Sequence, residues 1–208
     1  MKKALIYFIC LLTIKTSSFG QTSDTTINKN SKEVEVNLSI INTKILSQQF
    51  YGINWKIKYF PTDRLGTGVY ITVFQKKISD TFTYSIKEPV IDFYEFGWTN
   101  QYNFFKTNGV QAGINLINAL SMSRLGDNAV KEKYHKYMSK EVSTNYYYTL
   151  QPGAYFAFKL ISTKQNGGIW LTAETNYRFV FGKSKYAATK QFSGYSFGIG
   201  ISVKHSTD

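Results

Sequence analysis

The sequence contains very little cysteine and histidine and no long apolar run, and each shortage excludes a class of protein. The only cysteine, Cys10, lies near the amino terminus, so a domain held together by disulfides is not expected. The two histidines, His135 and His205, are far apart, and no cluster has the spacing of a metal site, so we expect neither a metal nor another cofactor. No apolar run reaches the roughly 18 residues of a membrane-spanning helix, which excludes a helical membrane protein.

The amino terminus has the composition of a secretory signal peptide. A basic start is followed by the apolar run Ala4 to Ile14, and small residues precede a cleavage site before Gln21. We therefore expect residues 1–20 to be cleaved. The polar residues 21–32 are expected to form a flexible leader, because they cannot bury enough surface to offset the entropy of ordering. An exported chain with neither disulfides nor a lipid-carrying cysteine is either a soluble secreted protein or an outer-membrane barrel.

Eight later segments alternate between apolar and polar side chains, which is the pattern of β-strands with two different faces. The clearest is Gly194 to Lys204, where aromatic and branched side chains occupy every second position against Ser, Gly and Lys. Its length matches the about 9–11 residues that a tilted strand needs to cross a bilayer. The eight predicted strands are residues 33–41, 49–60, 66–76, 91–104, 110–117, 146–160, 168–181 and 194–204.

The predicted connections alternate between short and long, which is typical of transmembrane barrels. Those after the second, fourth and sixth strands are short, and Asn108-Gly109 favours a tight hairpin with positive φ. Those after the third, fifth and seventh strands are longer, and the loop over residues 121–144 is expected to include a short helix at residues 128–139. Pro152 lies inside a predicted strand and predicts a bulge or a frayed end, because proline has no amide hydrogen.

Charged side chains are confined to one face of the predicted strands. The apolar face carries no Lys, Arg, Asp or Glu, as a bilayer requires, because a basic side chain at mid-bilayer costs about 2–4 kcal/mol. The charged face therefore points into the lumen, where we expect a network of Glu35, Lys56, Lys58, Glu95, Lys159, Glu174 and Arg178. Aromatic side chains on the apolar face predict girdles at the membrane interfaces. These lipid-facing residues are Tyr51, Tyr59, Tyr94, Trp98, Tyr146, Tyr148, Tyr177, Phe179 and Tyr195.

Together these features resemble the small outer-membrane β-barrel proteins of Gram-negative bacteria, the eight-stranded type that includes OmpA-like and OmpX-like barrels. The resemblance covers residues 33–204 and rests on the signal segment, the two-faced strands, the loop lengths and the Gly-rich aromatic terminal strand. It implies an all-β fold with eight antiparallel strands in up-and-down order, short periplasmic turns and longer extracellular loops, in one domain over residues 33–208. It also implies the cell outer membrane as location, with membrane lipid, lipopolysaccharide and the barrel-insertion machinery as partners.

The pattern carries no catalytic or binding motif, so the functional predictions concern the whole barrel. Eight strands enclose a lumen that side chains just fill, which favours a plugged barrel with a structural or surface-interaction role over a small pore or transport accessory. A soluble secreted barrel that binds an apolar ligand is the other alternative. An enzyme is not expected. The one catalytic alternative is outer-leaflet acyl transfer by His135 with Ser121, Ser123, Ser139 or Asp127. The basic residues are dispersed, so nucleic acid is not an expected partner.

Overall fold

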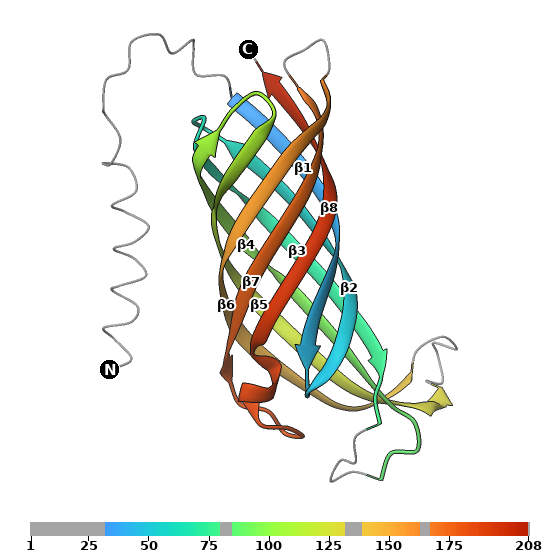
Figure 1. Ribbon diagram of the computed structural model, residues 1–208. Helices are drawn as coiled ribbons and strands as arrows, with labels where there is room; N and C mark the ends of the chain where they lie inside the picture. The colour runs from blue at the N-terminus through green and yellow to red at the C-terminus, as the bar shows by residue number, and fades with distance from the viewer. Residues whose placement is uncertain (1–31, 80–84, 132–138, 163–166, 208) are drawn as a thin grey trace, which may run out of the picture.

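Eight antiparallel strands form a closed, tilted ring in the computed structural model, which describes residues 32–79, 85–131, 139–162 and 167–207 (Figure 1). Each strand pairs with the next one along the chain, and β1 pairs with β8 to close the ring, so the predicted up-and-down barrel is confirmed. The strands are β1 (Lys32–Ile45), β2 (Gln48–Phe60), β3 (Leu65–Lys77), β4 (Pro89–Lys106), β5 (Val110–Lys131), β6 (Ser139–Ser162), β7 (Gly168–Gly182) and β8 (Gly194–Thr207), with the short 3-10 helix η1 (Thr189–Phe192) between β7 and β8.

Two of the expected features at the amino terminus fall largely outside this part of the chain. The predicted signal peptide, residues 1–20, lies outside the described residues, as does the predicted leader up to residue 31. Lys32, expected in the leader, already belongs to β1. Within the described ranges, no helix is long and apolar enough to cross a membrane.

The two ends of the barrel differ, and we name them by their connections. The short-turn rim, at the top of Figure 1, holds the β2–β3, β4–β5 and β6–β7 connections and both ends of the ring. The long-loop rim holds the β3–β4, β5–β6 and β7–β8 connections. The β1–β2 connection also lies there, but it is only the pair Leu46 and Ser47, whose φ angles of 51° and 62° are those of a tight hairpin turn. The predicted alternation of short and long connections therefore holds except at this hairpin.

The predicted hairpin at Asn108-Gly109 exists, but its backbone differs from the expectation. Neither residue has a positive φ. The turn is held instead by the Thr107 hydroxyl, which accepts hydrogen bonds from the amides of Gly109 (3.4 Å) and Val110 (3.0 Å). A threonine side chain therefore substitutes for the left-handed conformation that Asn-Gly would have allowed.

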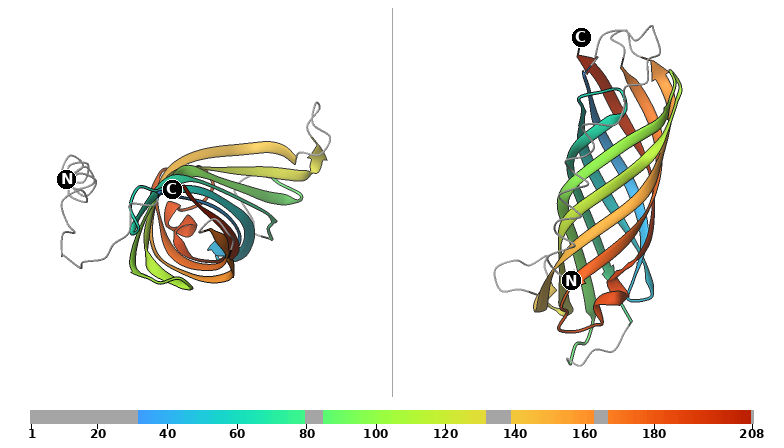
Figure 2. Two further views of the ribbon diagram at one scale, coloured as in Figure 1. Left: turned by 90° about the horizontal axis from the view of Figure 1, so that it is seen from above. Right: turned by 90° about the vertical axis from the view of Figure 1, so that its left-hand side faces the viewer.

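The prediction of a long loop over residues 121–144 is wrong. β5 and β6 pair from Ser121 with Tyr147 out to Lys131 with Ser139, so most of that segment is a β-hairpin that extends beyond the ring (Figure 2). The predicted helix over residues 128–139 is contradicted at both of its ends, and residues 132–138, with His135, lie outside the described residues. Alternation is weak here because neither face of this extension meets lipid, and two register shifts interrupt it further.

Pro152 interrupts one strand pairing without creating a bulge. Leu150 pairs with Phe179 of β7 and Gly153 pairs with Asn176, so the register is the same on both sides of the proline, although neither Gln151 nor Pro152 has a partner on β7. On the other edge, Pro152 pairs with Leu116 of β5. The missing amide hydrogen therefore removes a short piece of the ladder and leaves the register unchanged.

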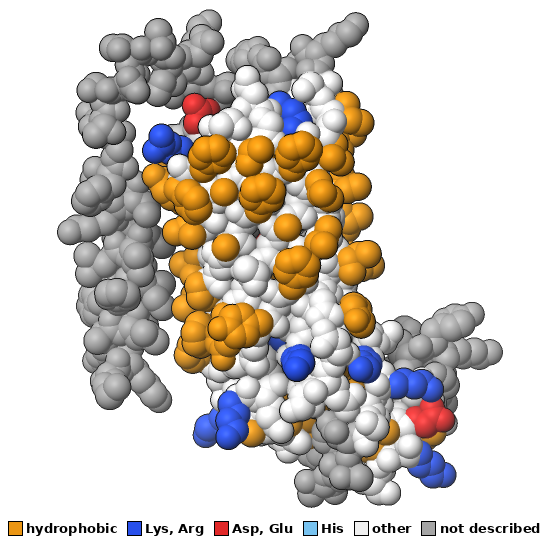
Figure 3. Space-filling view, in the orientation of Figure 1, with side chains coloured by type: hydrophobic (Ala, Val, Ile, Leu, Met, Phe, Trp, Pro, Cys, Tyr) orange, Lys and Arg blue, Asp and Glu red, His pale blue; other side chains and the backbone are white. Residues whose placement is uncertain are grey.

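The outward-facing side chains form an apolar band around the ring (Figure 3). At its centre, Leu38 and Ile40 of β1 are 58% and 68% exposed. Toward the long-loop rim charged residues replace apolar ones at these alternate positions, with Lys44 exposed on β1 and with Asp92 of β4 and Arg124 of β5 forming a buried pair at 3.7 Å. Figure 3 shows Lys and Arg side chains gathered beyond this edge of the band. The charged positions mark where the strands leave the bilayer.

Candidate functional site

The lumen contains a charged triad at the seam where the ring closes. Glu35 of β1 is fully buried, and its carboxylate oxygens lie 2.8 Å from Lys58 Nζ of β2 and 3.0 Å from Lys204 Nζ of β8. Strand register brings these groups together, because Glu35 is directly opposite Lys58 on one side and Lys204 on the other. A buried charge without a partner is strongly destabilising, so each member of this triad depends on the others.

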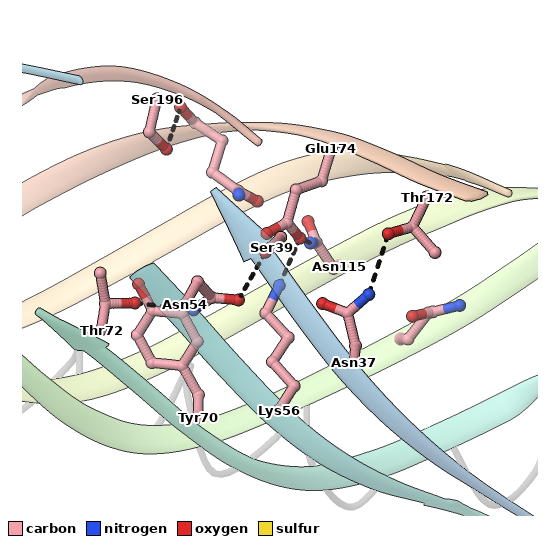
Figure 4. A network of polar contacts seen from close by, with 12 residues as sticks. Asn37, Ser39, Asn54, Lys56, Tyr70, Thr72, Asn115, Thr172, Glu174 and Ser196 are labelled. Carbon is pink, nitrogen blue, oxygen red and sulfur yellow. Dashed lines mark hydrogen bonds and ion pairs between the residues drawn. The ribbon is translucent and has the colours of Figure 1, made fainter. Parts of the chain in front are cut away.

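A second ion pair crosses the lumen nearer to the middle of the barrel. Lys56 of β2 pairs with Glu174 of β7, and Asn115 of β5 donates a hydrogen bond to the same carboxylate at 3.4 Å (Figure 4). These residues come from three strands that are not neighbours in the ring. Their side chains therefore meet across the bore.

Neutral polar side chains connect the walls around this pair. Asn54 of β2 accepts a hydrogen bond from the Ser39 hydroxyl at 3.2 Å and donates one to Thr72 Oγ1 at 2.7 Å (Figure 4). Asn37 donates to Thr172 Oγ1 at 2.9 Å. These neutral side chains thus hydrogen-bond to side chains of other strands, as a barrel of this size allows.

Arg178 lies closer to the long-loop rim and is almost completely buried. Its Nε donates to the backbone oxygen of Phe192 at 2.9 Å, and its Nη1 lies 3.8 Å from Glu95 Oε2. The guanidinium carbon lies 4.9 Å from the ring centroid of Phe93 and 5.7 Å from that of Phe74. Arg178 therefore contacts both the polar side chains of the lumen and the aromatic rings of Phe74 and Phe93 on its long-loop side.

Glu95, the partner of Arg178, also accepts three hydrogen bonds from neutral groups. The Tyr70 hydroxyl donates at 2.9 Å, the Gln151 amide at 3.0 Å and the Ser121 hydroxyl at 3.2 Å. These donors lie on β3, β6 and β5. The carboxylate is thus surrounded on several sides, which is the condition under which a buried charge is tolerated.

An apolar cluster of buried residues lies at the long-loop rim, and we call it the outer cap. Phe192 of η1 is fully buried, with ring centroids of Phe93 at 6.0 Å, Tyr147 at 5.2 Å and Tyr186 at 6.0 Å. Figure 2, left, shows η1 inside the outline of the ring. Burial raises the pKa of Tyr186, whose hydroxyl donates to Ser123 at 2.7 Å. The cap consists of Ile41, Ile45, Leu46, Phe50, Phe74, Ile78, Ile91, Phe93, Leu125, Tyr147, Tyr186 and Phe192.

The structure places all seven residues of the predicted lumen network on the inward face, but not all in one cluster. Glu174 and Arg178, neighbours on the same face of β7, belong to different pairs. Lys159 is only half-buried, and its Nζ lies 5.0 Å from the ring centroid of Trp170 near the short-turn rim. Lys204 was missing from the predicted network, although its place on the polar face of the terminal strand was a usable signal.

The outer cap was not foreseen. Phe50 and Phe74 share the inward parity of β2 and β3, so alternation places them inside, but it does not predict that they meet other rings there. The loop residues Tyr186 and Phe192 lie in no strand and had no periodic signal. Only the fold reveals that these rings converge.

The predicted girdle residues all face outward, and all but one lie toward an end of the band. Trp98 differs, because it lies between Tyr94 and Tyr102 on β4 and therefore within the band. Its indole nitrogen donates to Thr67 Oγ1 at 2.7 Å, which gives the polar end of the ring a partner away from the interface. At the long-loop end, Tyr177 and Tyr195 meet edge to face at 4.8 Å.

Of the candidate acyl-transfer residues, His135 lies outside the described residues. Ser121 and Ser123 point into the lumen and are buried, hydrogen-bonded to Glu95 and to Tyr186 respectively. The Asp127 carboxylate accepts hydrogen bonds from the amides of Glu88 (3.1 Å) and Ala129 (3.0 Å), so it anchors a loop. In the part of the chain that the structure describes, no three Cys, His, Asp or Glu side chains are grouped as metal ligands would be.

Solved structures share this fold, whereas no protein-family model and no curated protein matches the sequence. The outer membrane protein OprG from Pseudomonas aeruginosa has a TM-score of 0.56 at 9% identity, covering 86% of this chain and 98% of that one. Neisserial surface protein A has 0.53 at 11%, covering 85% and 97%. Ail, the attachment invasion locus protein of Yersinia pestis, has 0.51 at 11%, covering 85% and 99%. With this fold and its apolar exterior, the chain is an eight-stranded β-barrel protein of the cell outer membrane, as its sequence resemblance predicted.

Proposed function

We propose that this protein is a sealed outer-membrane barrel that acts at its long-loop rim, as a structural or surface-interaction protein and not as a pore or an enzyme. The filled lumen carries this proposal. The Lys56–Glu174 ion pair crosses the bore between β2 and β7, and the outer cap lies on the long-loop side of this pair. An ion path would have to break the Lys56–Glu174 and Arg178–Glu95 pairs and displace Phe192. Breaking one buried pair costs about 3–5 kcal/mol, so spontaneous opening should be rare.

Planar-bilayer conductance of the purified protein tests the seal. The expected result is no sustained ohmic current. Insertion is verified in parallel with vesicles of brominated lipid, which should quench the outward-facing Trp55 and Trp98. Sustained single-channel currents from protein that passes this insertion control would overturn the proposal in favour of the small-pore alternative.

The surface role is supported by the charge of the long-loop rim. The described residues of this rim expose many more basic than acidic side chains, and Glu88 and Glu141 are the exposed acidic ones. Ail was crystallised with sucrose octasulfate, a heparin analogue, which is a polyanion. The same charge class suits this rim. Its exposed lysines are Lys44, Lys77, Lys87, Lys140, Lys183, Lys185 and Lys190.

Calorimetric titration of sucrose octasulfate into the detergent-solubilised protein tests this role. We expect binding that weakens as salt is added, because exposed charges are screened within about 10 Å at 0.1 M salt. Replacing Lys140, Lys183 and Lys185 together with Gln should weaken it, whereas Arg64→Gln at the short-turn rim should not. Absence of binding at low salt, or an equal effect of Arg64→Gln, would refute a polyanion-binding rim.

A further inference from the structure

A groove on the outside of the barrel lies where the apolar band meets the long-loop rim. It has a volume of about 910 Å³ and is lined by residues of β1, β2, β7, β8 and the η1 segment. The strand ends create it. The pairing of β1 with β8 ends at Thr43 and Ser196, but β1 continues to Ile45. The amide of Leu46 donates to the Gln191 oxygen at 2.9 Å, so the β1–β2 turn and η1 close the groove at the rim side.

The groove combines aromatic walls with two basic side chains. Tyr177, Tyr195 and Phe197 line it on the outward faces of β7 and β8, and Tyr195 is 74% exposed. Lys44 and Lys190 also line it, and no Asp or Glu does. Among the residues that the structure describes, neither ammonium group has an ion-pair or hydrogen-bond partner. An anion of matching position would therefore meet two cations with no competing carboxylate.

The groove also continues directly into the lipid-facing surface. Asn42 of the groove is directly opposite Phe197, and the next outward pair along the same two strands is Ile40 with Ile199. Ile40 and Ile199 are 68% and 50% exposed and belong to the apolar band. A molecule that binds here with its charge at the lysines would lay its apolar part along these side chains. That arrangement is the shape of a phosphorylated membrane lipid and not of a free anion.

We propose that this groove is a binding site for a phosphorylated lipid of the outer leaflet, of the lipid A type. Lys44 and Lys190 bind a phosphate group, Tyr177 and Tyr195 contact the sugar or glycerol region, and an acyl chain follows Ile40 and Ile199. Lysine suits this role because its ammonium group is a point charge that binds phosphate from variable directions. The site does not depend on the sealed lumen or on the polyanion-binding role of the rim.

Native mass spectrometry of the protein released from neutral detergent micelles tests this site. We expect retention of diphosphorylated lipid A, about tenfold weaker retention of the same lipid without phosphates, and no displacement by equimolar inorganic pyrophosphate. Lys44→Gln with Lys190→Gln should weaken retention of the phosphorylated lipid about tenfold, to the level of the dephosphorylated one. Folding of each variant is checked by its shift on unheated gels.

Lys183→Gln with Lys185→Gln is the matched control, because it removes the same charge from the same rim at exposed positions outside the groove. It should leave lipid retention unchanged while it weakens sucrose octasulfate binding. Equal losses from the two double variants would overturn the groove and indicate general surface charge. Equal retention of the dephosphorylated lipid, or displacement by pyrophosphate, would overturn recognition of a lipid phosphate.

Discussion

Replacing Glu35 with Gln should destabilise the barrel far more than the same substitution at its surface. Glu35 is fully buried between Lys58 Nζ at 2.8 Å and Lys204 Nζ at 3.0 Å. The amide of Gln fills the same space without charge. Lys204 keeps Glu33 at 3.6 Å, but Lys58 retains only a neutral acceptor, Gln101, at 2.6 Å. Leaving a buried charge unpaired costs about 3–5 kcal/mol, which is the expected loss in unfolding free energy.

Glu88→Gln provides the control, because Glu88 pairs with Lys77 at 3.0 Å and both side chains are at least half exposed. An exposed pair contributes little to stability, because water screens its charges. Both variants are compared by urea unfolding in lipid vesicles, followed by tryptophan emission. Adding Lys58→Met to Glu35→Gln should restore part of the lost stability, because it removes the uncompensated charge. If Glu35→Gln costs no more than Glu88→Gln, or if Lys58→Met makes it worse, the lumen is solvated like the surface and the reasoning fails.

Three further predictions test the two faces and the rim. Among single-tryptophan variants in brominated-lipid vesicles, the fluorescence of those that keep Trp55 or Trp98 should be quenched strongly, and that of the variant that keeps the buried Trp170 should not. The reverse order would show that the apolar face of the strands points into the lumen. Gly52→Ala should lower the unfolding free energy by about 1–3 kcal/mol, because its Cβ would lie 2.4 Å from the Phe74 ring, whereas Gly109→Ala meets nothing within 4 Å and should be near neutral. The pKa of Glu88 is lowered by hydrogen bonds from Lys77 and then Asn128, so its stabilisation is complete above the ordinary glutamate pKa of about 4 and is lost as pH falls through the lower folded value. Hydrogen exchange in the β3–β4 connection, corrected for the intrinsic rate, should rise in that window in the wild type and not in Glu88→Gln.

The sequence predicted the spanning part of this barrel because each strand there lies between two unlike environments. Trp55 and Lys56, adjacent in the chain, have opposite surroundings, and lipid tolerates only the first. Alternation therefore reports burial directly, and all eight strands were found. Alternation stops predicting the strands where they leave the bilayer. Beyond Tyr94 and Tyr146 the outward faces of β4, β5 and β6 no longer meet lipid, so the period weakens in the sequence while the hydrogen-bonded ladder continues.

The candidate site divides in the same way. Glu35, Lys56 and Lys58 could be placed in the lumen from parity alone, but their partners depend on register, which parity does not determine. The outer cap depends on even less local information. Phe192 reaches the lumen through a loop, and nothing in its neighbours distinguishes it from a lipid-facing ring. The lipid groove arises from the unequal ends of β1 and β8, which only the three-dimensional fold reveals.

The lumen pairs also imply that the barrel gains much of its stability in a single closing step. Lys56 and Glu174 are 118 residues apart, and Asn37 and Thr172 are 135 residues apart, so neither contact forms within a local hairpin. Glu35 meets Lys204 only when β1 pairs with β8. In an open sheet these groups lack their partners. Long-range contacts stabilise the protein only after the entropy cost of closing the chain has been met. A partly formed sheet would therefore expose the charged face that the closed ring satisfies, which favours folding to the complete ring over any intermediate number of strands.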